Sequence, residues 1–163
     1  MKHLDVCTHI DFIEDRDILT RPNFDVNIRL LQSSSSYREI IRDICDYISD
    51  LATFTKDGYK TPHGWSGANA GIPFNIIAIP GQVYLNPKII KVSKERKLVK
   101  TNCGSLTLEN PVPKLRYTLI DIEYYDLGGI YHRELNIPPN PGFTIQHEIE
   151  HTQGILIIDT LNS

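Results

Sequence analysis

The sequence has few cysteines, no long apolar run and no excess of basic residues, and each absence excludes a class of protein. Its 3 cysteines lack tight spacing, which argues against a disulfide framework and favours a reducing cytoplasm. No apolar stretch is long enough to cross a bilayer, and acidic residues interrupt the first 17 positions, where a signal peptide needs an apolar core. A net charge of −3 gives no electrostatic reason to expect nucleic acid or an anionic membrane as a partner.

The order of the predicted elements indicates one α+β domain over residues 1–163. Apolar residues at helical spacing predict a first helix from Tyr37 to about Phe54. A capping box, Ser36 with Glu39, is expected to open it after a polar loop over residues 33–36. Strands are expected at 74–79, 82–86, 89–93 and 98–101, then over a longer run at 114–125, and at 130–135 after a turn at 126–129.

The second predicted helix carries Gln146-His147-Glu148-Ile149-Glu150-His151, which has the pattern H-E-x-x-H. Residues four apart lie on one helix face, so His147 and His151 can offer two imidazoles to one metal ion. Glu148 follows the first histidine, where it can take a proton from a metal-bound water. The alternative is a polar helix face with two histidines by chance. The helix is expected to open at Pro141 and Gly142 and to stop at Gly154.

A catalytic metal site of this kind needs a third protein ligand and one open position. The longer pattern H-E-x-x-H-x-x-G-x-x-H fits as far as Gly154 and fails at Ile157. Asp159 is the only ionisable candidate that follows, and it stands just beyond an apolar run. We therefore expect the third ligand upstream.

The upstream candidates are the cysteines and the four other histidines. Cys7 lies in a segment without a predicted element, and Cys45 lies in the apolar stripe of the first helix, so it is predicted to be core. Cys103 stands between two strand runs beside Gly104, and a thiolate is a strong ligand for a divalent ion. We predict Cys103 as the ligand, the alternative being a half-buried strand cysteine.

A run of small residues over positions 62–73 precedes the strands. Small side chains let the backbone come close to a ligand or to another element. A tight loop without function is the alternative interpretation.

In this order the motifs resemble those of the peptide deformylase family, G-x-G-x-A-A-x-Q, then E-G-C-L-S, then Q-H-E-x-D-H. The third motif is matched at 146–151, with Glu150 where the family usually has Asp. The second keeps Cys103 and Ser105 but has Thr101, Asn102 and Gly104 at its other positions. The first, aligned over 62–69, keeps one glycine and the small residues and places Asn69 where the family has Gln. The resemblance covers about residues 18–161. Residues 1–17 are extra, and the C-terminal helix of many bacterial members is missing.

The resemblance implies antiparallel sheets around a central helix that carries H-E-x-x-H. It also implies a cytoplasmic metallohydrolase that removes the formyl group from the N-terminal formyl-methionine of nascent polypeptides. The family works best with one Fe(II) ion, with Zn, Ni or Co as substitutes. The implied site has Cys103, His147 and His151 as metal ligands, Glu148 as general base, Asn69 and the Gly104 N–H as oxyanion donors, and Gly64, Trp65, Ser66 and Gly67 along the substrate.

Two alternatives remain open beside that function. The departures at Asn69, Asn102 and Gly104 suit a divergent amidase that acts on another N-formyl or small N-acyl substrate. A non-catalytic metal-binding relative is disfavoured, because such a site has no use for Glu148. Asn69 is one methylene shorter than Gln, so we expect weaker deformylase activity than the family shows. Strong ribosome docking is not expected without the basic C-terminal helix, and a monomer is the default.

Overall fold

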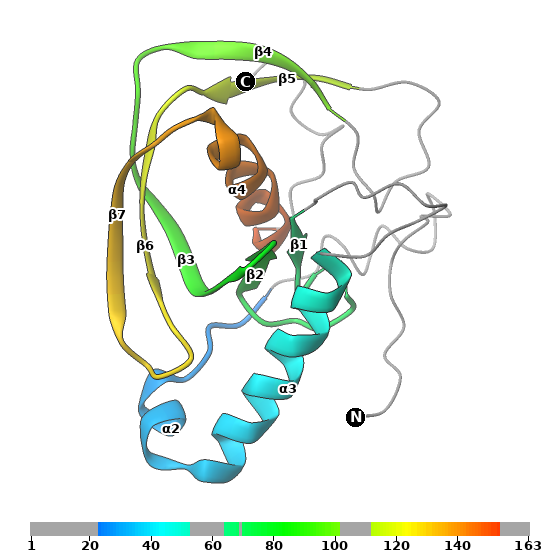
Figure 1. The fold of residues 1–163 in the computed structure, drawn as a ribbon, viewed down its shortest axis with the longest axis vertical. Helices are drawn as coiled ribbons and strands as arrows, with labels where there is room; N and C mark the ends of the chain where they lie inside the picture. Colours follow the sequence, from blue (N-terminus) through cyan, green and yellow to red (C-terminus); the bar gives the residue numbers. More distant parts are fainter. Residues whose placement is uncertain (1–22, 53–63, 69, 102–111, 154–163) are drawn as a thin grey trace.

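The computed structural model describes residues 23–52, 64–68, 70–101 and 112–153, which form an α+β fold (Figure 1). None of the helices in these ranges is long and apolar enough to span a membrane. The described helices are α2 (Ile28–Ser33), α3 (Ser35–Ala52) and α4 (Pro139–Thr152). The described strands are β1 (Trp65–Ser66), β2 (Ile76–Ile79), β3 (Gln82–Val92), β4 (Arg96–Thr101), β5 (Val112–Tyr117), β6 (Ile120–Tyr125) and β7 (Tyr131–Ile137).

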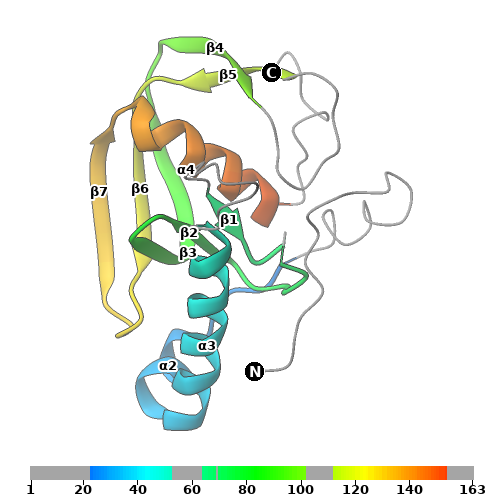
Figure 2. The ribbon, with the colours of Figure 1, turned by 45° about the vertical axis from the view of Figure 1, so that its right-hand side comes forward.

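The strands form two antiparallel sheets that curve around helix α4. One sheet has five strands in the order β1-β2-β3-β6-β7, and the other pairs β4 with β5. Helix α4 contacts β1, β2, β3, β5 and β7, so it lies within the curve of the strands. Figures 1 and 2 show α4 on one side of β2 and α3 on the other. The predicted arrangement of antiparallel sheets around a central helix is therefore confirmed.

Strand β2 contributes to a hydrophobic core on each of its faces. Its sequence is Ile-Ile-Ala-Ile, and all four residues are buried. Successive side chains of a strand point to opposite faces. Ile76 and Ala78 accordingly pack in the cluster that holds α3, whereas Ile77 and Ile79 pack with Ile145 of α4. This continuous apolar run fixes α4 relative to the rest of the fold.

The predicted first helix is confirmed as α3, but its start differs from the prediction. Ser34, not Ser36, caps the helix, because the Ser34 hydroxyl accepts the Tyr37 N–H at 3.2 Å. The predicted polar loop at 33–36 was wrong in part, since Ser33 ends helix α2. Asn27 caps α2 by accepting the Leu30 N–H at 3.1 Å. A helix of 6 residues is too short to show a clear apolar period in the sequence.

Two strand predictions also need correction. The runs predicted at 82–86 and 89–93 form one strand, β3, which carries Asn86 at a φ of 52° between them. The Asn86 amide binds both backbone groups of Val26, which holds this irregular position in place. The long strand predicted at 114–125 is two strands, because the chain turns at Thr118 and Leu119. There the Leu119 N–H donates to the Ser93 hydroxyl at 3.1 Å, and pairing changes from β4 to β3.

Cys45 lies in the core on the α3 side, as predicted, and is 1% exposed. Burial, with a smaller contribution from Asp46, raises the pKa of its thiol from 9.0 to about 12. The thiolate is the reactive form, so at pH 8 its population is lower than in an ordinary cysteine by about three powers of ten. We expect Cys45 to escape iodoacetamide in the native protein and to react fully in urea, as measured by peptide mass mapping. Rapid labelling of Cys45 in the native state would contradict its core position.

Candidate metal centre

Helix α4 buries polar side chains as well as apolar ones, among them Gln146, Glu148 and His151. Asn140 has a non-helical φ of −110°, so the regular helix begins at Pro141, where the sequence predicted its opening. The described helix ends at Thr152, and the predicted stop at Gly154 lies outside the described residues. Ile145 and Ile149 are buried toward β2 and β6. The intervening residues of the same helix hold the candidate site.

The structure brings His147 and His151 together. Their Nε2 atoms lie 3.2 Å apart, and the candidate ligand atoms of His147, Glu148 and His151 are all within 4.8 Å of one another. Metal–nitrogen bonds of about 2.0–2.1 Å at a tetrahedral angle separate two ligand nitrogens by roughly 3.3 Å. The spacing of the two imidazoles therefore fits a single divalent ion held between their Nε2 atoms.

Burial favours the neutral form of both imidazoles. It lowers the pKa of His147 well below its usual value, and the neighbouring His151 and the Arg116 guanidinium act in the same direction. Burial, with a contribution from Arg116, lowers the pKa of His151 to about 4. Metals bind the neutral imidazole, so these shifts suit a ligand pair.

Glu148 is a buried carboxyl group beside the two histidines. Its side chain is 4% exposed, and its Oε1 atom lies 3.9 Å from His147 Nε2. Within the described part of the chain, its Oε2 atom has no hydrogen-bond partner. Burial raises the pKa of Glu148 to about 8, partly offset by Arg116. A carboxyl group with this proton affinity can accept and return a proton near neutral pH.

Gly64 packs directly against this part of α4. A Cβ atom at Gly64 would lie 2.5 Å from Glu148 Cγ and 2.6 Å from Thr144 Cγ2, closer than any side chain allows. The backbone before β1 thus comes close to Glu148, as the run of small residues in the sequence would permit.

The other three residues assigned to the substrate have different surroundings. Trp65 and Ser66 form β1 and are buried, with Trp65 in the core on the α3 side. A Cβ atom at Gly67 would lie 2.6 Å from the carbonyl oxygen of Phe74 and 2.7 Å from that of Ile72. The glycine is therefore needed for the close approach of this backbone to the segment that leads into β2. Of the four, Gly64 is the one that the structure places against Glu148.

Three further predicted site residues lie outside the described ranges. They are the third ligand Cys103 and the two oxyanion donors, Asn69 and Gly104. Their roles stay predictions.

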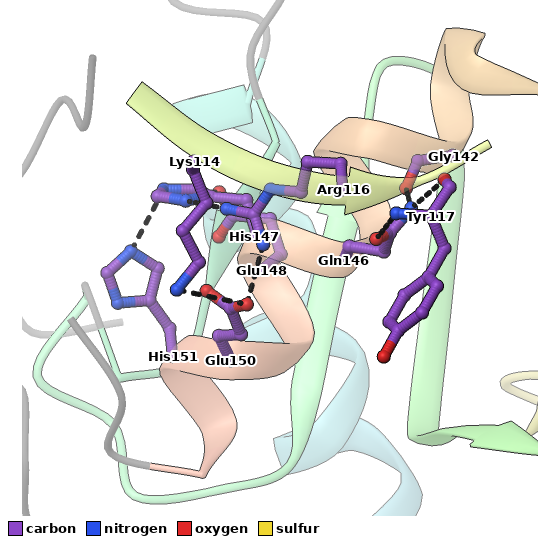
Figure 3. A network of polar contacts seen from close by, with 9 residues as sticks. All are labelled: Lys114, Arg116, Tyr117, Gly142, Gln146, His147, Glu148, Glu150 and His151. Atoms are coloured by element: carbon purple, nitrogen blue, oxygen red, sulfur yellow. Dashed lines mark hydrogen bonds and ion pairs between the residues drawn. The ribbon is translucent and has the colours of Figure 1, made fainter. Parts of the chain in front are cut away.

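Two buried cations on β5 face α4 and were not anticipated from the sequence. Lys114 and Arg116 are each 2% exposed, whereas a lysine and an arginine at alternate strand positions are usually read as an outer face. Arg116 Nη1 donates to Glu150 Oε1 at 2.6 Å, and Lys114 Nζ lies 3.7 Å from the same oxygen (Figure 3). The sequence held one sign of this pairing: two cations at alternate positions of a strand, and an acidic residue, Glu150, on the helix that carries the histidines.

Gln146 fastens α4 to β5. Its Nε2 donates to the Tyr117 carbonyl at 2.9 Å and to the Gly142 carbonyl at 3.2 Å, and its Oε1 accepts the Tyr117 N–H at 3.0 Å (Figure 3). The side chain is thus fully used in packing the helix on the strand. This contact sets the position of His147, the next residue along the helix.

The Asn23 side chain binds the C-terminal end of α4, and its truncation should destabilise the fold. Its Nδ2 donates to the Thr152 carbonyl at 3.1 Å and to the His151 carbonyl at 3.5 Å. We expect Asn23→Ala to lower the free energy of unfolding by about 1 kcal/mol, measured in urea. Asn23→Asp should cost more, because a carboxylate repels helix C-terminal carbonyls. An Asp variant more stable than the Ala variant would contradict the capping role.

Comparisons with known proteins agree on one family. The polypeptide deformylase family profile matches residues 52–163, more than half of the chain. A peptide deformylase of Latilactobacillus sakei is 34% identical over 82 residues, 49% of this chain and 44% of that protein. One of Levilactobacillus brevis is 25% identical over 170 residues, 93% of this chain and 89% of that protein. The crystal structure of the Thermotoga maritima peptide deformylase has the same fold, with a TM-score of 0.73 at 18% identity and full coverage of both chains.

Proposed function

Because the chain belongs to the polypeptide deformylase family, we propose that it is a metal-dependent hydrolase that removes the formyl group from N-terminal formyl-methionine. The family is one of hydrolases, and the relatives compared above are named peptide deformylases. The observation that carries the proposal is the pair of imidazoles 3.2 Å apart, with a buried carboxyl group beside them. We place the reaction in the cytoplasm, with formylated peptides as substrates.

The metal ion would be held by His147 Nε2 and His151 Nε2, with Cys103 as the proposed third ligand. A divalent ion there lowers the pKa of water and polarises a carbonyl group. We propose Fe(II) as the natural ion, with Zn(II) or Ni(II) as substitutes. The low pKa values of the two histidines support this ligand set.

Glu148 is proposed to move the proton. It takes a proton from the water that attacks the formyl carbon and delivers it to the amine nitrogen as the C–N bond breaks. The products are formate and a free N-terminal methionine. The burial of Glu148 and its raised pKa support this role. Asn69 and the Gly104 N–H are the proposed donors to the oxygen that becomes negative.

A pocket beside the base is proposed to receive the first side chain of the peptide. It is lined by Ile79, Pro80, Asn140, Pro141 and Thr144. Thr144 stands four residues before Glu148, so it lies on the same side of α4. The apolar part of this lining suits a methionine side chain.

The short side chain of Asn69 leads to a prediction for its two simplest variants. We expect Asn69→Gln to raise turnover of formyl-Met-Ala-Ser severalfold, because the longer amide restores reach toward the oxyanion. Asn69→Ala should lower turnover, because it removes the amide. Both rates are compared at equal metal content. Unchanged rates in both variants would remove Asn69 from the site.

A second candidate function is also compatible with membership of this family. The departures at Asn69, Asn102 and Gly104 favour an amidase that acts on another N-formyl or small N-acyl substrate. Metal analysis of anaerobically purified protein, followed by assays on formyl-Met-Ala-Ser and on a panel of other formamides, tests both. Faster hydrolysis of formyl-Met-Ala-Ser than of the panel supports the deformylase. Hydrolysis of another formamide alone supports the amidase, and a metal-free, inactive protein contradicts both.

A further inference from the structure

We propose that the corner between β3 and β4 docks on the anionic surface of a lipid bilayer. The corner joins the end of β3 to the start of β4 at one end of the molecule (Figure 1). It is defined by six exposed residues, Val92, Lys94, Arg96, Lys97, Leu98 and Leu119. The inference does not depend on the proposed function, because it uses no residue of the candidate metal centre.

Backbone hydrogen bonds hold the corner together. The Ser93 N–H donates to the Leu119 carbonyl at 2.9 Å, and the Leu119 N–H donates to the Ser93 hydroxyl at 3.1 Å. The Thr118 N–H donates to the Glu95 carbonyl at 3.2 Å. The connection from β3 to β4 is thus bound to the connection from β5 to β6, so the exposed side chains of both belong to one surface.

The corner is basic, although the chain as a whole is acidic. Residues 91–98 hold four cations and one acidic residue, whereas the net charge of the chain is −3. Lys94, Arg96 and Lys97 are exposed, and among the described residues none of them forms an ion pair with a carboxylate. The net charge alone gives no reason to expect an anionic membrane, but its distribution does, because each cation close to an anionic leaflet adds to the attraction.

The other end of the molecule carries more acidic residues than basic ones. Helix α3 has two arginines and four exposed acidic residues, Glu39, Asp43, Asp46 and Asp50. Figures 1 and 2 both place α3 at the end of the molecule away from β4. The field of this charge distribution turns the corner, and not α3, toward an anionic surface.

Exposed aliphatic side chains at the corner favour lipid over nucleic acid as the partner. Val92, Leu98 and Leu119 are 40%, 60% and 42% exposed. Aliphatic groups enter the interfacial layer of a bilayer and add to the electrostatic attraction there. A phosphodiester backbone offers them no comparable environment, and residues 91–98 contain no aromatic side chain that could stack on a base. Cations mixed with aliphatic groups therefore fit an anionic lipid surface.

Vesicle binding by the unmodified full-length chain is the direct test. Co-sedimentation compares vesicles of phosphatidylcholine alone with vesicles in which about one third of the lipid is phosphatidylglycerol. We expect binding to the anionic vesicles to be stronger by about tenfold or more. It should weaken as salt is added, because salt screens exposed charges. Equal binding to both kinds of vesicle, or binding to neither, would overturn the proposal.

A triple variant tests the cations of the corner. Lys94→Gln/Arg96→Gln/Lys97→Gln should weaken binding to the anionic vesicles by about 100-fold, because each cation near the surface contributes about fivefold. The urea midpoint of the variant shows whether it is folded. Should it not fold, the comparison of the two kinds of vesicle with the unmodified chain decides.

A matched triple variant removes the same charge from exposed positions elsewhere. Arg29→Gln/Arg42→Gln/Arg133→Gln changes residues on α2, α3 and β7. Its binding to the anionic vesicles should fall by less than about tenfold, through the change in net charge alone. Equal losses in the two triple variants would show that binding follows net charge and not the corner.

The aliphatic side chains and a competing partner are tested together. Leu98→Asn should weaken vesicle binding by about tenfold. Leu135→Asn, at a leucine of β7 that is 58% exposed, should leave it unchanged. An RNA duplex is the second probe, at the same salt concentration. Tighter binding of the unmodified chain to the duplex than to the anionic vesicles, or vesicle binding that is insensitive to Leu98→Asn, would assign the corner to another polyanion and reject the lipid surface.

Discussion

Replacing Glu148 with Gln lowers the turnover of formyl-Met-Ala-Ser by about 10²–10⁴-fold, the range that positioned proton transfer contributes. Gln keeps the shape of the side chain but can neither accept nor return the proton. The Glu148 Oε1 atom is 3.9 Å from His147 Nε2, so the two histidines and the metal ion proposed to bind them should stay in place. The measurement is kcat at saturating substrate, together with the metal content of each sample.

Stability and metal content separate this effect from damage to the fold. Glu148 is 3% exposed and its pKa is raised by burial, so its ionised form is costly in the folded state. Glu148→Gln should therefore unfold at the same or a higher urea concentration than the unmodified chain. The matched control is Glu39→Gln on the exposed side of α3, which should alter neither property. Retained turnover in Glu148→Gln at full metal content would exclude Glu148 as the base.

The elements that could be predicted from the sequence are those whose signal is local. Helix α3 has a buried stripe at helical period, and the H-E-x-x-H pattern depends only on spacing within α4. The approximate positions of the strands follow from short apolar and β-branched runs between turns. The division of 114–125 into two strands does not, because residues on both sides of the turn have strand character. It depends on which strand each half pairs with, and pairing is a tertiary property.

The residues that surround the candidate site could not be predicted from the sequence for a similar reason. Lys114 and Arg116 alternate along β5 like an outer face, and their pairing with Glu150 on α4 is a tertiary contact that the sequence does not show. The hydrogen bond from Asn23 to the end of α4 joins residues 129 positions apart and has no motif. Gly64 was identified as one of several small residues, but its contact with Glu148 depends on how the two segments meet.

That contact leads to the second large effect, in Gly64→Ala. The added Cβ would lie 2.5 Å from Glu148 Cγ and 2.6 Å from Thr144 Cγ2, against about 3.5–4.0 Å for a normal carbon contact. Either the backbone or the Glu148 side chain must move by about 1 Å, and a displacement of that size at a reacting group can cost about 10²-fold in rate. The overpacking should also lower the free energy of unfolding by about 1–3 kcal/mol. We expect both losses, measured as kcat and as the urea midpoint.

Two further variants show whether the lost rate comes from Glu148 itself. Gly81→Ala meets no atom within 4 Å but has a φ of +81°, so it should lose stability through backbone strain and keep its turnover. Thr144→Ser in the Gly64→Ala background removes the methyl group 2.6 Å from the new Cβ and leaves the contact with Glu148. This double variant should regain part of the stability while turnover stays low, because the base is still displaced. Full recovery of turnover would assign the loss to Thr144, and normal turnover in Gly64→Ala alone would show that the segment before β1 does not constrain the base.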